Sequence, residues 1–231
     1  LTAKALGVEL LVHYGHSCLI PVDQTSGIKV LYIFVDIKID PLHFIETIKM
    51  NFPTSKKLSL VSTIQFVTTL QVVSSKLKEM GFEVSVPQFR PLSPGEILGC
   101  TAPILRCADV VIYLGDGRFH LEAAMIANPK LEAYRYDPYD KKFTHEHYDH
   151  QKMNSLRLSS ISLAKSAEIV GVIMGTLGRQ GNTGVVEHLR KRLTEENRKV
   201  IVILLSEIFP NKLNLFHSIN AFVQIACPRL S

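Results

Sequence analysis

Short apolar runs alternate with helical patterns along most of the chain. The runs that predict strands are Leu10–Gly15, Val30–Ile37, Leu58–Ser62, Glu83–Val86, Asp109–Leu114, Ile169–Gly175, Lys199–Leu205 and Ala221–Ala226. Between Gln65 and Met80, apolar residues recur at spacings of three and four, which predicts a helix that ends at Gly81. Further helices are expected over about 144–168 and 184–196. Because parallel strands need crossover helices, this alternation predicts an α/β fold with parallel sheets.

Three of the apolar runs end in a turn of small or polar residues. They precede His16-Ser17-Cys18, Asp116-Gly117-Arg118 and Cys227-Pro228. Ligands of parallel sheets bind beyond the carboxyl ends of the strands, so three similar units meeting at these ends would share one central site. The predicted division is the end of a first α/β domain at 1–22, a second domain at 23–135 and a third at 136–231. The first domain is expected to be incomplete, and the chain to be cut at both ends.

Composition narrows the function classes only moderately. The 231 residues are 46% hydrophobic, which suffices for a sizeable core, and the net charge of +5 is too modest to indicate direct nucleic-acid binding. No apolar stretch reaches the length of a membrane span. The four cysteines form no CxxC pair, so a reducing, cytoplasmic location is expected.

One string matches a known metal motif. His145-Glu146-His147-Tyr148-Asp149-His150 has the HxHxDH pattern of metallo-β-lactamase-like hydrolases. Those sites need a later Asp that bridges two metals, and no Asp follows Asp149. A helix beginning at Thr144 would also keep the three histidines from converging on one ion. The polar start of a helix is therefore the favoured interpretation, and an α/β metallohydrolase is the alternative.

Two glycine-rich turns follow predicted strands. Gly175–Gly181 (GTLGRQG) would expose backbone N–H groups and a helix N-terminus to an anion, but it lacks the dinucleotide GxGxxG spacing, and a purely structural turn explains it equally well. In Leu114–His120 (LGDGRFH), Asp116 lies between two glycines, and Arg118 could form a bidentate ion pair with a carboxylate. The alternative there is a turn in which Asp116 and Arg118 pair with each other.

The cysteines differ in their surroundings. Cys100 lies in a loop bracketed by Pro and Gly, and Cys227 directly follows a predicted strand, so both thiolates would be accessible. Cys107 is expected on a helix, where a cysteine is usually a small buried apolar residue. Spacing alone favours a structural role for lone cysteines over a metal site.

Many longer strings carry a family resemblance. They include YGHS at 14–17, STIQF at 62–66, PLSPGEILGC at 91–100, YLGDGRFH at 113–120, EHYDH at 146–150, GTLGRQG at 175–181 and ACPRL at 226–230. Together they resemble the diphthamide synthesis family over essentially the whole chain, and within it the eukaryotic catalytic subunits. The resemblance implies three homologous α/β domains around a central site.

The resemblance also implies a chemistry. A 4Fe–4S cluster would be held by three cysteines, of which Cys100 matches the second and Cys227 the third; the first would lie upstream, and the surroundings of Cys18 do not match it. S-adenosylmethionine would be the substrate, cleaved to a 3-amino-3-carboxypropyl radical that adds to a histidine of translation elongation factor 2. A paralogous subunit and an electron-donor protein would be partners. A non-catalytic binding subunit of the same complex is the alternative.

The strand-end turns would then serve that substrate. We expect these turn residues to hold the methionine part of S-adenosylmethionine or to shape its pocket: Asp116, Arg118, Gly178, Arg179 and Gln180.

Overall fold

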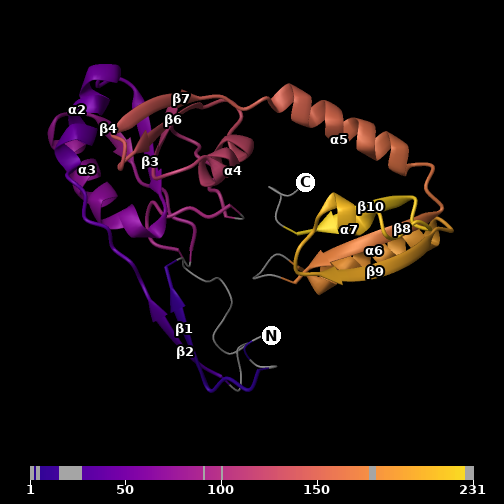
Figure 1. The fold of residues 1–231 in the computed structure, drawn as a ribbon. Coiled ribbons are helices and arrows are strands. Elements are labelled where there is room, and N and C mark those ends of the chain that lie inside the picture. The colour runs from indigo at the N-terminus through magenta and orange to yellow at the C-terminus, as the bar shows by residue number, and fades with distance from the viewer. Residues whose placement is uncertain are drawn as a thin grey trace. The chain divides into compact units, whose positions relative to one another are not determined.

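The chain forms two compact units in the computed structural model, which describes residues 3, 6–15, 28–90, 92–99, 101–176 and 181–226. The units are Leu1–Tyr148 and Asp149–Ser231. The described part of the first unit contains a two-stranded and a five-stranded sheet, and that of the second a three-stranded sheet (Figure 1). Most strand pairs are parallel and are joined through helices, which confirms the predicted α/β class.

The five-stranded sheet has the order β4-β3-β5-β6-β7. Its strands are β3 (Lys57–Ser62), β4 (Glu83–Ser85), β5 (Val110–Leu114), β6 (Glu132–Asp137) and β7 (Lys142–Glu146). The first four run parallel, and β7 returns antiparallel to β6 through a tight turn in which Lys141 has a φ of 52°. Every residue of β5 is buried, as expected for a central strand covered on both faces.

Helices cover both faces of this sheet (Figure 1). The helices α2 (Pro41–Asn51) and α3 (Val67–Glu79) pack on one face, where Leu60 and Ile112 of the strands meet Phe44 and Leu70. The helix α4 (Phe119–Ala127) packs on the other face, with Val111 and Tyr113. The short 3-10 helix η2 (Ile64–Phe66) leads into α3. Successive strand residues thus alternate between two cores, which is the pattern of a three-layer α/β/α arrangement.

The smaller sheet of the first unit consists of β1 (Leu10–Tyr14) and β2 (Lys29–Ile33), which pair in parallel. The prediction that strands start near these positions is confirmed, although β2 ends at Ile33, earlier than the expected Ile37.

The second unit is a smaller α/β sheet. Its strands β8 (Ile169–Gly175), β9 (Lys199–Leu205) and β10 (Ala221–Ile225) are all parallel, in the order β10-β8-β9. Its helices are α5 (His150–Ala164), α6 (Thr183–Glu195) and α7 (Pro210–Leu213). The guanidinium of Arg198 donates to the carbonyl oxygens of Ala164, Lys165 and Ala167 at 2.6–3.0 Å, so it satisfies acceptors left free at the end of α5.

Two expectations about the middle of the chain, the helix start near residue 144 and the helical position of Cys107, need correction. Residues 144–146 do not begin a helix but complete strand β7; α5 starts at His150, where Asp149 accepts a hydrogen bond from the N–H of Lys152 at 2.8 Å. Cys107 does not lie on a helix but in an exposed turn. Strand β7, which lies after residue 135, hydrogen-bonds to β6. The division into three homologous domains stays a prediction.

Candidate functional site

The carboxyl ends of β3, β5 and β6 form one edge of the five-stranded sheet. A single parallel bridge joins Ser62, the last residue of β3, to Glu96, with hydrogen bonds from Ser62 N to Gly95 O (2.8 Å) and from Ile97 N to Ser62 O (2.9 Å). This bridge brings the loop that leads to Cys100 to the same edge as the turn after β5. Cys100 itself lies outside the described residues.

The turn between β5 and α4 depends on two glycines. A Cβ atom at Gly115 would lie 2.5 Å from the hydroxyl oxygen of Tyr113, and Gly117 has a φ of +65°, which L side chains rarely adopt. Asp116 lies between them and is exposed, and its carboxylate has no hydrogen bond or ion pair with any described residue. The turn therefore presents a free carboxylate at the edge where ligands of parallel sheets bind.

Arg118, predicted as a partner for a ligand carboxylate, is already engaged on three sides. Its Nε lies 3.1 Å from Oε1 of Glu122, and its Nη1 lies 3.0 Å from Oε2 of Glu146. Its Nη2 donates to the carbonyl oxygen of His147 at 2.9 Å. The alternative that Arg118 pairs with Asp116 is not what the structure shows. A ligand carboxylate would have to displace one of the three present partners.

Glu146 is a charged group that the sequence argument did not single out. It is only 9% exposed, and it lies between two arginines: Arg118 on one oxygen and Arg135, at 3.5 Å, on the other. The hydroxyl of Thr144 also donates to Glu146 Oε1 at 2.7 Å. The opposite charges and hydrogen bonds compensate the cost of burying this carboxylate.

The HxHxDH string has several separate structural roles. Glu146 takes part in the arginine pairs, Asp149 caps α5, and the ring of His145 stacks on Tyr134 with centroids 4.5 Å apart. Over the described ranges, no group of three or more His, Cys, Asp or Glu side chains is placed to hold a metal ion.

A second buried carboxylate, Glu96, lies on the loop that precedes Cys100. Its Oε2 accepts a hydrogen bond from Ser93 N at 3.0 Å, and it is 1% exposed. Its Oε1 and the hydroxyls of Ser62 and Thr101 are buried and have no hydrogen-bond partner among the residues described. Unpaired buried polar atoms are rare, and each calls for a physical explanation such as local strain, a chemical role or a bound water or ion. The sequence held only one signal for Glu96, its place between the Pro-Gly turn and Cys100.

The buried side chain of Tyr113 packs against the turn that contains Asp116. Burial is the main cause that raises the pKa of its phenol well above the usual value, and the nearby Thr63 side chain partly opposes the shift. The phenol therefore stays protonated at neutral pH, and its O–H donates to the carbonyl oxygen of Asp116 at 3.4 Å.

In the second unit, the glycine-rich segment again follows a strand. Strand β8 ends at Gly175, and Asn182 begins α6 by accepting a hydrogen bond from Val185 N at 3.1 Å. A Cβ atom at Gly181 would collide with the carbonyl oxygen of Gly175, so only glycine lets the chain return this closely. Three predicted ligand residues and one predicted cluster ligand lie outside the described residues: Gly178, Arg179, Gln180 and Cys227.

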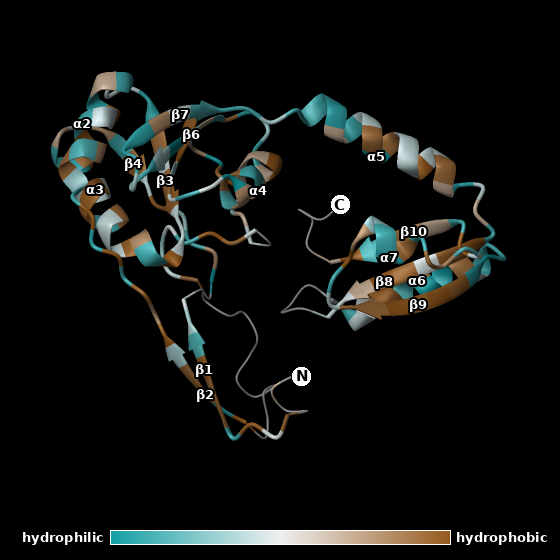
Figure 2. Cartoon of the chain, in the orientation of Figure 1, coloured by the Kyte–Doolittle hydropathy of each residue, from teal (hydrophilic) through white to brown (hydrophobic). Residues whose placement is uncertain are grey.

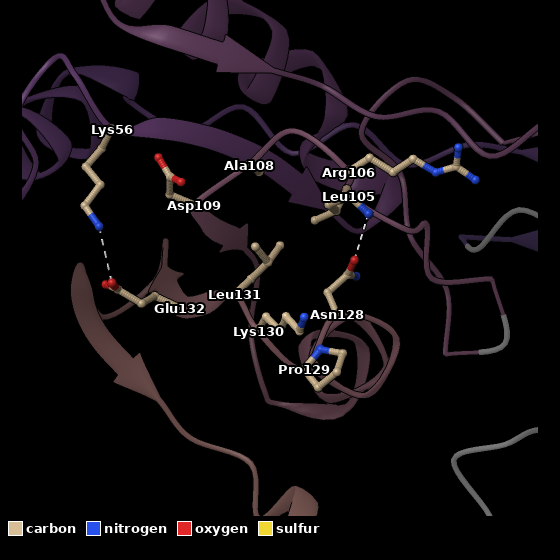
Figure 3. Close-up of a pocket in the computed structure, with 10 residues that line it drawn as sticks. All are labelled: Lys56, Leu105, Arg106, Ala108, Asp109, Asn128, Pro129, Lys130, Leu131 and Glu132. Atoms are coloured by element: carbon tan, nitrogen blue, oxygen red, sulfur yellow. Dashed lines mark hydrogen bonds and ion pairs between the residues drawn. The ribbon is translucent and has the colours of Figure 1, made fainter.

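A cavity of about 570 Å³ lies at the opposite, amino-terminal edge of the five-stranded sheet (Figure 3). Its polar groups largely satisfy one another. Lys56 pairs with Glu132 at 3.3 Å, Asp109 accepts from Lys57 N at 3.0 Å, and Asn128 accepts from Leu105 N at 2.7 Å. Because ligands of parallel sheets bind at the other edge, the cavity is a weaker candidate than the Asp116 turn.

The fold defines an α/β protein with parallel sheets, and its candidate site lies on turns that follow strands. The family model described as "Putative diphthamide synthesis protein" matches residues 1–231, so the chain belongs to the diphthamide synthesis family. This confirms the resemblance carried by the sequence strings.

Individual relatives agree. The chain is 59% identical over 230 residues to the 2-(3-amino-3-carboxypropyl)histidine synthase subunit 1 of Nematostella vectensis and 58% identical over 231 residues to that of Gallus gallus. The two alignments cover 100% of this chain but only 49% and 56% of those proteins, so the chain spans about half the length of these relatives. A crystal structure of Dph2 from Pyrococcus horikoshii with a 4Fe-4S cluster superposes with a TM-score of 0.78 at 27% identity, covering 99% of this chain and 67% of that one.

Within the described ranges, no helix has both the length and the apolar character needed to cross a bilayer.

Proposed function

We propose that the chain is part of a subunit that transfers the 3-amino-3-carboxypropyl group of S-adenosylmethionine to a histidine of translation elongation factor 2. The observation that carries this proposal is the identity of 58–59% over the whole chain to relatives named as synthases of 2-(3-amino-3-carboxypropyl)histidine. That name specifies the group and the acceptor side chain, and the first step of diphthamide synthesis is the reaction that joins them. A target in translation fits a cytoplasmic location.

A 4Fe–4S cluster is the cofactor that this proposal requires. The P. horikoshii relative contains one, and Cys100 and Cys227 would be the ligands that this chain supplies. Glu96 and Thr101, which flank Cys100 in the sequence, are buried, and their Oε1 and Oγ1 atoms have no hydrogen-bond partner among the described residues. When bound, the cluster supplies the electron that breaks the bond between the sulfonium sulfur and the γ-carbon.

The protein's own residues would bind and orient the substrate. The exposed carboxylate of Asp116 can accept hydrogen bonds from the ammonium or hydroxyl groups of S-adenosylmethionine. The segment with Gly178, Arg179 and Gln180 precedes the N-terminus of α6, where backbone N–H groups and the helix dipole favour a carboxylate. Each turn, taken by itself, therefore suits one charge of an amino acid: the Asp116 turn an ammonium group, and the segment before α6 a carboxylate.

The proposed partners follow from the same reaction. They are translation elongation factor 2 as the protein substrate, a paralogous subunit, and an electron-donor protein that reduces the cluster. The relatives are named as subunit 1, which supports assembly with a further subunit.

The direct test uses the full-length subunit together with its paralogous partner, reconstituted anaerobically with iron and sulfide and reduced with dithionite. We expect label from the methionine carboxyl group of S-adenosylmethionine to appear on elongation factor 2. A factor with the acceptor histidine replaced should stay unlabelled. If the reduced, iron-loaded complex leaves the factor unlabelled, the proposal is wrong.

A further inference from the structure

The buried Glu146 joins an edge strand to the turn that presents Asp116. It belongs to the string that resembles a metal motif, yet its two oxygens contact the guanidinium groups of Arg118 and Arg135 and the hydroxyl of Thr144. The reaction proposed above does not use it. Its surroundings are those of a charge that fixes other groups in place.

We infer that Glu146 is a positioning residue, which acts through Arg118 to hold the Gly115–Gly117 turn so that Asp116 faces the substrate. The part of this inference that concerns S-adenosylmethionine rests on the proposed function. The part that concerns the order of the turn stands on the contacts alone.

The turn needs such an anchor because it is built from flexible residues. Gly117, with a φ of +65°, adds no side chain that could restrain the backbone, and the hydrogen bond from Tyr113 to Asp116 O is long at 3.4 Å. Arg118 follows immediately and occupies the N-cap position of α4, so its position fixes the far end of the turn. Ion pairs between a guanidinium and a buried carboxylate are strong and directional, and Glu146 provides the more buried of the two carboxylates that Arg118 contacts.

The anchor also sets the charge that the turn offers to a ligand. Nε, Nη1 and Nη2 of Arg118 each have a partner within the protein. The side chain of Arg118 is still 46% exposed, but its charge is paired, whereas the exposed carboxylate of Asp116 has no partner among the described residues. The turn therefore selects a hydrogen-bond donor of the substrate and not its carboxylate.

Hydrogen–deuterium exchange of the full-length subunit tests the anchor without reference to activity. Glu146→Gln keeps the size of the side chain and removes its charge. We expect faster exchange in peptides that cover residues 114–118, with unchanged exchange in β3 and in residues 110–113 of β5. Glu132→Gln, which breaks an exposed ion pair with Lys56 on the same sheet, is the matched control and should leave residues 114–118 unchanged. Unaltered exchange there in Glu146→Gln would overturn the inference.

Steady-state kinetics of the reconstituted complex tests the link to the substrate. We expect Glu146→Gln to raise KM for S-adenosylmethionine about tenfold while kcat and iron content stay at the wild-type level, since couplings of neighbouring residues are typically within a factor of a few to about a hundred. Arg118→Gln should have a similar effect, and the double variant should be no worse than either single one. The link to the substrate would be refuted if the increases in KM of the two single variants multiplied in the double variant. It would also be refuted if Glu146→Gln exchanged faster but kept the wild-type KM. A wild-type complex without turnover would count against the proposed function alone, and the exchange result would still decide whether Glu146 anchors the turn.

Discussion

The two units build similar strand–turn–helix elements but bury them to different degrees. In the five-stranded sheet, helices pack on both faces, and the whole of β5 and most of β3 are buried. In the second unit, α5 buries no side chain and β9 alternates between exposed and half-buried residues, with Leu204 60% exposed. Figure 2 shows apolar residues along β9 and among the polar residues of α5. The first unit therefore fixes its strand-end turns by its own packing, and the second has less of its own core to do so.

The largest expected difference comes from truncating matched leucines. Leu60→Ala on β3 removes a fully buried side chain and should lower the free energy of unfolding by about 2–5 kcal/mol. Leu204→Ala on β9 should cost less than about 1 kcal/mol, because that side chain is already largely hydrated. Urea unfolding followed by circular dichroism measures both. Equal losses would show that the second sheet is covered as completely as the first.

A smaller difference is expected from adding a methyl group at matched glycines. At Gly95 the φ is +86° and a new Cβ would collide with the buried side chain of Leu70, so Gly95→Ala should cost about 2–4 kcal/mol. At Gly171 on β8 the nearest atoms belong to Phe222, at 2.7 and 2.9 Å, and this half-buried ring can shift. Gly171→Ala should therefore cost about 1 kcal/mol. Thermal unfolding distinguishes the two, and a similar shift for both would contradict the difference in packing.

Removing a helix cap should lower the stability of the whole fold in the first unit and cause only local fraying in the second. Asp40 accepts from Leu42 N at the start of α2, which buries Phe44 and Ile48, so Asp40→Ala should lower global stability by about 1 kcal/mol. Asp149→Ala removes the equivalent cap of α5, and because that helix buries nothing, the expected result is local fraying. Amide exchange at Lys152 should accelerate without a change in the unfolding midpoint. A lower midpoint for Asp149→Ala would mean that α5 is packed.

The smallest expected effect is a loss of folding stability at alkaline pH. Burial raises the pKa of Tyr113 in the folded protein, so above a pH of about 10 the unfolded chain releases this proton first and unfolding becomes easier. The contribution of the protonated Tyr113 to folding stability is fully present below that pH and is lost as the pH rises further. In Tyr113→Phe the fall in stability above pH 10 should be shallower than in the wild type, whereas Tyr139→Phe, an exposed phenol, should follow the wild type. Parallel curves for both variants would refute this role of burial.

The sequence predicted the regular, apolar parts of the fold well. The strands β3, β8 and β9 lie within a residue of their expected bounds. In β8 and β9, runs of valine and isoleucine leave few alternatives to a strand. The helix α3 and its C-terminal Gly81, with a φ of +87°, were likewise expected from periodicity. Helices α2 and α4 were missed, since both are short and α4 is apolar on several sides.

Residues 144–146 were wrongly expected to begin a helix because tertiary contacts, and not local sequence, determine their structure. Strand β7 is polar, and its position is set by pairing with β6 and by the ion pair between Glu146 and Arg118, neither of which leaves a local pattern. The candidate site was predictable as turns after strands, because glycines mark where the backbone must turn tightly. The three-sided engagement of Arg118 was not predictable, since Glu146 lies 28 positions further along the chain.

We propose that Cys100 and Cys227 are ligands of an iron–sulfur cluster. Iron and sulfide analysis of the full-length subunit after anaerobic reconstitution tests it most directly. We predict that Cys100→Ser and Cys227→Ser each lose the bound cluster, while Cys107→Ser, at an exposed free cysteine that precedes β5, retains wild-type iron. Wild-type iron content in Cys100→Ser and Cys227→Ser would contradict the account.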